Sequence, residues 1–147
     1  PARGPLTESP PMTPTLLALT GFLAWTLLLL LLMEAQRVRL VATKAVAPNG
    51  FVPDNANLSP FMQRLARAHA NCVESLPLLG GLMLVAVVAG RSAVTDPLAW
   101  VLLGARIVQS SAHLASLSVA AVNLRFAAFA VQLGIALWWA GRLLFAA

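Results

Sequence analysis

The feature that most constrains the fold is a run of nineteen residues, 15–33, without a charged side chain. A helix rises about 1.5 Å per residue, so this run can cross a hydrocarbon core of roughly 30 Å. Its length and the lack of a small-residue cleavage site argue against a cleaved signal peptide. Hydrophobic residues make up 59% of the chain and charged residues 10%, which excludes an ordinary soluble protein. The sequence therefore predicts an all-α integral membrane protein.

Three further apolar segments predict a bundle of four transmembrane helices. Proline follows a capping residue at Pro60 and at Pro97, which is typical of a helix start. Pro77 is expected to kink the second helix, where two adjacent glycines allow another helix to approach. We expect a disordered tail over residues 1–14 and a single four-span domain over residues 15–147. The predicted helices cover about residues 15–33, 60–89, 97–118 and 124–145.

Basic residues gather around the first predicted loop, residues 34–59, whereas the second loop has one arginine offset by an aspartate. The positive-inside rule then places loop 34–59 in the cytoplasm and both termini on the opposite side. We expect a multi-pass protein of a bacterial inner membrane or an equivalent membrane. The net charge of +5 is interpreted as a signal for membrane orientation and not for nucleic-acid binding, because no aromatic-basic groove accompanies it.

The second predicted helix carries a stripe of polar side chains. At about 100° per residue, one face of this helix holds Arg64, Arg67, Asn71 and Glu74. Lipid cannot satisfy these groups, so they must face protein or water. A binding site fits this pattern, and so does a polar seam that joins helices. His69 falls almost opposite the stripe and is expected to be structural.

A second stripe lies on the third predicted helix and comprises Arg106, Gln109, Ser110 and His113. An arginine near the middle of a span needs a carboxylate partner or an aqueous cavity. Glu74 is the only acidic residue within an apolar span, so we expect Glu74 and Arg106 to pair or to share one network. With Arg125 at the start of the fourth helix, these residues predict a basic pocket for an anionic or zwitterionic ligand. Cys72, the single cysteine, excludes an intrachain disulfide and is expected to be a packing residue.

The segment from Arg67 to Pro77 resembles a family signature. It matches the pattern Arg-Ala-(His/Gln)-x-Asn-x-x-Glu followed by proline, found in the MAPEG family of membrane-associated proteins in eicosanoid and glutathione metabolism, and its spacing fits the bacterial members. Arg106 and Arg125 also fall where this family places arginines. The resemblance covers roughly residues 15–145.

This resemblance implies a left-handed four-helix bundle assembled as a homotrimer, with glutathione bound between neighbouring subunits. It implies that Arg125 stabilises the glutathione thiolate, because a cationic side chain lowers a thiol's pKa. No metal and no nucleic acid is expected. The predicted ligand-binding residues are Arg64, Arg67, Asn71, Glu74, Arg106, Gln109 and His113.

The chain departs from the family at four positions. Relatives often have tyrosines three and seven residues after the helix-three arginine, where this chain has Gln109 and His113. The prostaglandin E synthases have a serine and a tyrosine one and four residues after the helix-four arginine, where this chain has Phe126 and Phe129. Glutathione binding is expected to survive these changes better than any particular reaction.

Three functions fit these observations. The leading hypothesis is a glutathione S-transferase or peroxidase that acts on lipophilic electrophiles or lipid hydroperoxides from the bilayer. The alternative is a catalytically inactive family member that acts as a binding or structural subunit of a membrane complex, which the absence of tyrosine favours. A small transporter or channel subunit is disfavoured, because the sequence has no repeat symmetry and only one buried acid.

Overall fold

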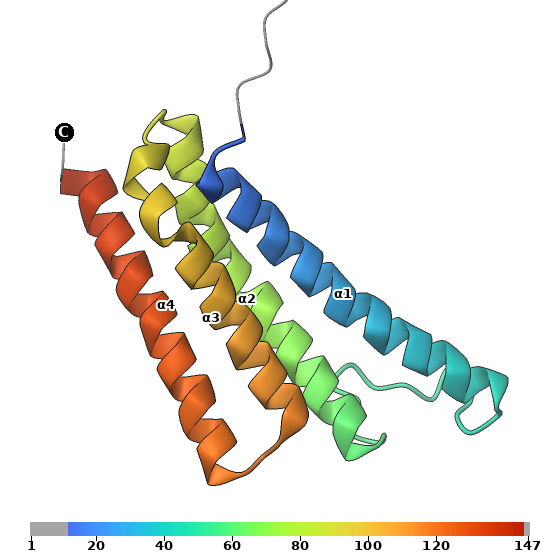
Figure 1. Cartoon of the computed structure of the whole chain (residues 1–147). Helices are drawn as coiled ribbons and strands as arrows, with labels where there is room; N and C mark the ends of the chain where they lie inside the picture. The colour runs from blue at the N-terminus through green and yellow to red at the C-terminus, as the bar shows by residue number, and fades with distance from the viewer. Residues whose placement is uncertain (1–11, 146–147) are drawn as a thin grey trace, which may run out of the picture.

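The structure is a computed structural model that describes residues 12–145, and the predicted N-terminal tail therefore lies almost entirely outside the described residues. Within 12–145 the chain forms four α-helices and one 3-10 turn, with no strand, which confirms the all-α prediction (Figure 1). In chain order the elements are α1 (Pro14–Ala42), α2 (Pro60–Val88), η1 (Ser92–Val94), α3 (Asp96–Ala115) and α4 (Val119–Phe145).

Three of these helices, α1, α2 and α4, are long and apolar enough to cross a membrane. The shorter α3 does not belong to this group, because Asp96, Arg106 and His113 lower the hydropathy of its twenty residues. Both ends of the described chain lie at one end of the bundle, and the loop between α1 and α2 lies at the other (Figure 1).

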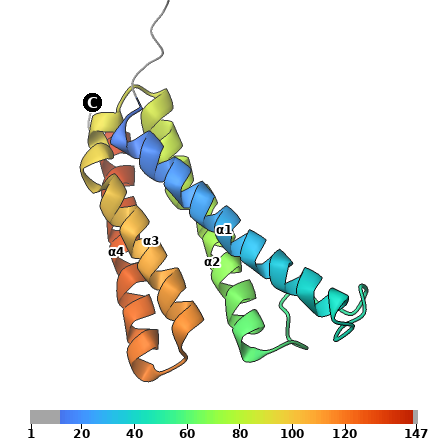
Figure 2. The same cartoon turned by 45° about the vertical axis from the view of Figure 1, so that its right-hand side comes forward.

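The helix ends differ from those predicted mainly at α1 and α4. α1 continues beyond residue 33 to Ala42, because the glutamate and arginines that end the apolar run are good helix formers. α3 ends at Ala115 and α4 begins at Val119, which leaves a shorter link than expected. α2 runs through Pro77 without a break. The C-terminal half of α1 diverges from the other helices (Figures 1 and 2).

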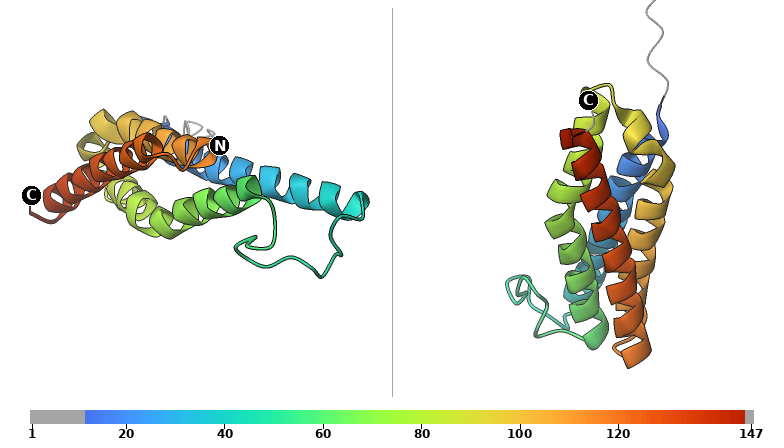
Figure 3. Two further views of the ribbon diagram at one scale, coloured as in Figure 1. Left: turned by 90° about the horizontal axis from the view of Figure 1, so that it is seen from below. Right: turned by 90° about the vertical axis from the view of Figure 1, so that its left-hand side faces the viewer.

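The helices run along roughly one axis (Figure 3). They enclose a core that includes five fully buried side chains, Phe22, Leu65, Met83, Leu102 and Trp139. Glycines allow α1 to approach α2 and α3 closely. A Cβ atom on Gly80 would lie 3.0 Å from Leu19 Cδ1 of α1, and one on Gly21 would lie 2.7 Å from Leu103 Cδ2 of α3. The expected close approach at Gly80 is therefore present.

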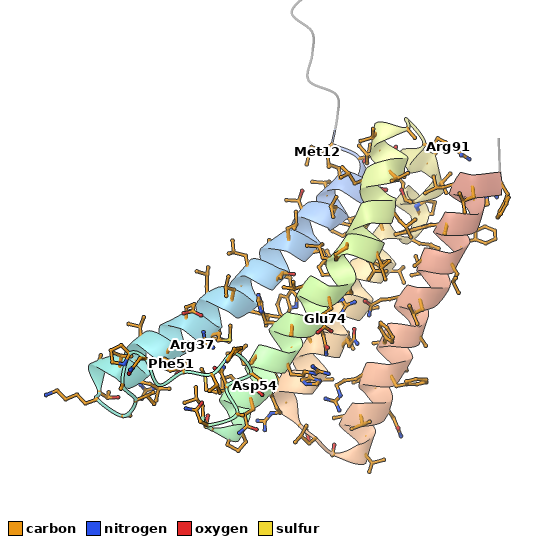
Figure 4. The ribbon with its side chains drawn as sticks, turned by 180° about the vertical axis from the view of Figure 1, so that it is seen from behind. Met12, Arg37, Phe51, Asp54, Glu74 and Arg91 are labelled. Carbon is orange, nitrogen blue, oxygen red and sulfur yellow. The ribbon has the colours of Figure 1, made fainter. Side chains whose placement is uncertain are left out.

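Polar contacts join the helices at both ends of the bundle. At one end, the backbone N–H and the hydroxyl of Thr15 donate to Asp96 Oδ1 at 3.0 and 2.6 Å. At the other end, the buried Asn55 accepts from Arg37 Nη2 at 2.7 Å and donates to the Met62 carbonyl at 3.2 Å. Arg37 also lies over the Phe51 ring (Figure 4). These contacts tie the loop between α1 and α2 to both helices.

Candidate functional site

A pocket of about 570 Å³ lies between α2, α3 and α4. This volume falls within the range of small-molecule sites. Glu74 lies on the side of α2 that faces α4 (Figure 4). The polar part of the lining comprises Asn71, Glu74, Ser75, Arg106 and Gln109. The apolar part extends toward the end of the bundle that holds both termini, along Leu78, Leu79, Leu82, Phe129, Leu133, Ala136, Leu137 and Ala140.

Arg106 is the buried charge of this pocket, with 1% of its surface exposed. Its Nη1 donates to the Asn71 carbonyl at 3.3 Å, and its Cζ lies 5.3 Å from the centre of the Phe22 ring. Its Nε and Nη2 have no hydrogen-bond partner in the part of the chain that the structure describes. These two groups lie on one edge of a guanidinium, which is the geometry that binds both oxygens of a carboxylate.

Glu74 and Arg106 are expected to pair or to share one network, and of these two arrangements the direct ion pair is absent over residues 12–145. Over residues 12–145 the only ion pair joins Arg37 to Glu34, at 3.0 Å. Both residues line the pocket, but Glu74 is exposed at its open side whereas Arg106 is buried against Phe22. The difference in depth explains why the side chains do not meet.

Contacts from α1 and α2 support the backbone around Arg106. Ser110 Oγ donates to the Arg106 carbonyl at 2.6 Å and accepts from Trp25 Nε1 at 3.1 Å. Cys72 Sγ lies 3.7 Å from the same hydroxyl and is fully buried, as expected of a packing residue. The sequence did not indicate Phe22 or Trp25 as parts of the site, because the apolar α1 has no polar stripe to mark the face that turns inward.

The remaining predicted site residues lie outside the pocket, near the end of the bundle where α3 ends and α4 begins. Arg125 Nη1 donates to His113 Nδ1, and Arg67 and Arg64 also lie close enough to His113 to act on it electrostatically. Arg64 Nε donates to the Leu114 carbonyl at 3.0 Å, at the last turn of α3. A guanidinium has no acceptor, so His113 accepts through Nδ1 and carries its proton on Nε2.

The structure therefore divides the predicted residues into two groups. Asn71, Glu74, Arg106 and Gln109 line the pocket, whereas Arg64, Arg67, His113 and Arg125 form what we term the basic end cluster. His113 follows Arg106 by seven residues, which separates them by roughly 10 Å along α3. A single basic pocket was expected, and the spacing along the helix explains why the two groups are distinct.

The two phenylalanines of α4 at family positions differ in their surroundings. Phe129 lines the pocket, where its ring offers no hydroxyl to a ligand. Phe126 is 73% exposed and does not line the pocket.

Fold and site together define an all-helical membrane protein with a pocket between α2, α3 and α4 that contains a buried arginine. The chain belongs to the MAPEG family, whose family model matches residues 15–145, nearly the whole chain. This match confirms the resemblance that the α2 motif indicated and agrees with the three apolar helices. Curated proteins and solved structures give no significant match to the chain.

Proposed function

We propose that this protein binds glutathione in the pocket between α2, α3 and α4 and acts as a glutathione S-transferase or peroxidase. The observation that carries the proposal is Arg106, a buried guanidinium that lines the pocket and has no partner at Nε or Nη2 within residues 12–145. A buried charge without a counterion is strongly destabilising, so an anionic ligand gains much by pairing with it. MAPEG family membership supports glutathione as that ligand.

The polar lining suits each part of glutathione. Arg106 is complementary to a carboxylate, and the carboxylate of Glu74 to the ligand's ammonium group. The side-chain amides of Asn71 and Gln109 can bond to its peptide groups. Bound glutathione would supply a thiolate that attacks an electrophilic carbon and displaces its leaving group as an anion. With a hydroperoxide, the thiolate would attack the terminal oxygen and break the O–O bond, which releases the lipid alcohol and leaves a sulfenic acid that a second glutathione converts to the disulfide and water. Arg125 would stabilise this thiolate, which requires a ligand that extends from the pocket to the basic end cluster.

The apolar part of the pocket would receive the second substrate. The side chains in this part of the pocket offer no hydrogen bond to a substrate, so the class of substrate that fits is a lipophilic electrophile or lipid hydroperoxide from the bilayer. These side chains include Leu78, Leu82, Leu133 and Leu137. We further propose that α3 is the fourth span, that loop 34–59 is cytoplasmic in a bacterial inner membrane or equivalent, and that the chain forms homotrimers.

A second candidate function is a binding or structural subunit without catalysis. Two observations favour it. Arg125 is bonded to His113 and does not line the pocket, and Phe129 lines the pocket without a hydroxyl. In this case glutathione would bind but no conjugate would form.

The experiment that tests the first proposal is a thermal-shift titration of the detergent-purified chain with reduced glutathione. A ligand at a hundredfold excess over its Kd stabilises the folded state by about 2.7 kcal/mol. The shift should be lost in Asn71→Ala and in Glu74→Ala, and kept in Val73→Ala, which changes an exposed residue of the same helix outside the pocket. No shift in the native chain at millimolar glutathione would refute glutathione binding.

An activity assay then separates the two candidates. The native chain is mixed with glutathione and either a model aryl halide or a lipid hydroperoxide. Formation of the thioether, or of oxidised glutathione with the lipid alcohol, supports the enzyme. Binding without either product would favour the non-catalytic subunit.

A further inference from the structure

Gln132 is a fully buried amide on α4 with a defined orientation. Its Nε2 donates to Gln109 Oε1 at 3.0 Å and to the Ala128 carbonyl at 2.9 Å. A backbone carbonyl can only accept, so the Gln132 atom that contacts Ala128 must be the amide nitrogen. The Gln109 atom that contacts this nitrogen must then be the carbonyl oxygen. The backbone of α4 therefore determines the direction of the contact between the two glutamines.

This direction decides what Gln109 presents to the pocket. Gln109 lies one turn after Arg106 on α3, and both line the pocket. Its Oε1 is occupied by Gln132, which leaves the Nε2 group as the part of the amide available to a ligand. The Nε and Nη2 groups of Arg106 are also without a partner over residues 12–145. The α3 wall of the pocket thus offers N–H donors, which suit an anion.

We propose that Gln132 is a positioning residue that holds Gln109 as a hydrogen-bond donor to an anionic group of the ligand bound beside Arg106. The assignment rests on the proposed function, because the carboxylates of glutathione are the groups that would accept from these donors. Without Gln132, the Gln109 amide could turn its carbonyl oxygen to the pocket, where it would repel a carboxylate. Gln132 Oε1 is buried without a hydrogen-bond partner among residues 12–145, which costs free energy that an apolar side chain at this position would not. A glutamine at this position in spite of that cost fits the positioning role.

The competing explanation is that this hydrogen bond only joins α3 to α4, as buried amides do in other membrane bundles. In that case a substitution at Gln132 would alter the stability of the bundle without acting through Gln109. Ligand affinity measured beside the unfolding free energy distinguishes the two roles. A bond that only joins the helices changes the unfolding free energy and leaves the affinity unchanged. The positioning role lowers the affinity, and effects that do not add in a double-mutant cycle then show that the loss passes through Gln109.

The test is calorimetric titration of the detergent-purified full chain with reduced glutathione. It compares the native chain, Gln109→Met, Gln132→Met and the double variant. A lost hydrogen bond to a charged group predicts a loss of affinity of about tenfold in each single variant. In the Gln109→Met background, Gln132→Met should cause no further loss. Trp139→Phe is the control, because it removes another buried N–H group of α4 outside the pocket and should leave the affinity unchanged.

The outcomes separate this proposal from the function on which it rests. An unchanged affinity in Gln132→Met, or an equal loss in both backgrounds, would overturn the positioning role while glutathione binding stands. A native chain that takes up no glutathione would overturn both. If Gln132→Met does not fold, Gln132→Asn, whose shorter amide cannot reach Gln109, should give the same cycle.

Discussion

Replacement of Arg106 by methionine should weaken glutathione binding at least tenfold and change the unfolding free energy of the ligand-free protein by less than about 2 kcal/mol. Arg106 is 1% exposed, and no carboxylate lies within ion-pair distance of it in residues 12–145. A buried charge carries a desolvation penalty of several kcal/mol, which an apolar side chain of similar volume removes. Removal of one partner of a buried ion pair costs about 3–5 kcal/mol, so the size of the change shows whether Arg106 has a counterion.

The magnitude follows from the contacts that Arg106 makes. The substitution removes one long hydrogen bond to Asn71, about 1 kcal/mol. It also removes the contact with the Phe22 ring, roughly 0.5–2 kcal/mol. The relief of desolvation offsets both losses, so the unfolding free energy should change by less than about 2 kcal/mol in either direction. Glutathione would lose its carboxylate partner, and its affinity should fall at least tenfold, since a charge-assisted hydrogen bond contributes about 1.5–3 kcal/mol.

Thermal unfolding in detergent, with and without reduced glutathione, measures both quantities. Arg106→Lys serves as the comparison, because it keeps the charge but loses the planar fork that binds both oxygens of a carboxylate. It should bind glutathione weakly and, without ligand, be less stable than Arg106→Met. A ligand-free Arg106→Met variant destabilised by much more than 2 kcal/mol would show that Arg106 has a counterion in the native assembly. That result would refute the reasoning, and so would unchanged glutathione affinity.

Three further predictions concern other parts of the bundle. Asp96→Ala should lower the unfolding free energy by about 1–3 kcal/mol in thermal denaturation, because the backbone and hydroxyl of the buried Thr15 lose their acceptor. Asp54→Ala, in an exposed loop turn, is the control, and equal effects of the two substitutions would contradict the stabilising role of Asp96. Leu82→Trp should narrow the apolar part of the pocket and raise KM for a lipophilic electrophile while leaving glutathione affinity unchanged; an unaltered KM would exclude this part of the pocket as the substrate site. Cys72 should resist a maleimide in the folded protein and react after denaturation, because it is fully buried; rapid labelling of the folded protein would contradict its place in the core.

The pattern along α2 predicted which face of this helix turns toward the interior of the bundle. The stripe that contains Asn71 and Glu74 turns toward a pocket, as expected from polar groups that lipid cannot satisfy. The start of α2 at Pro60 also agrees with the capping signal of Ser59 and proline. Such features are local, because helical periodicity and capping depend on residues within a few positions of one another.

Three-dimensional packing decided the remaining features. A helical stripe gives the direction of a side chain but not its depth, so Arg106 and Glu74 share a pocket without forming the expected ion pair. The orientation of the Gln109 amide depends on Gln132, twenty-three residues further along the chain. Phe22 reaches Arg106 from a helix whose uniformly apolar sequence does not mark its inward face.

By itself, the sequence of this protein determined its class, its family and the helix faces that carry polar groups, because burial in lipid restricts the backbone to helices and polar side chains to the interior. Only the tertiary structure decided which of those groups meet. Contacts between helices depend on the depth, rotation and separation of elements far apart in the chain, and periodicity within one helix does not contain this information.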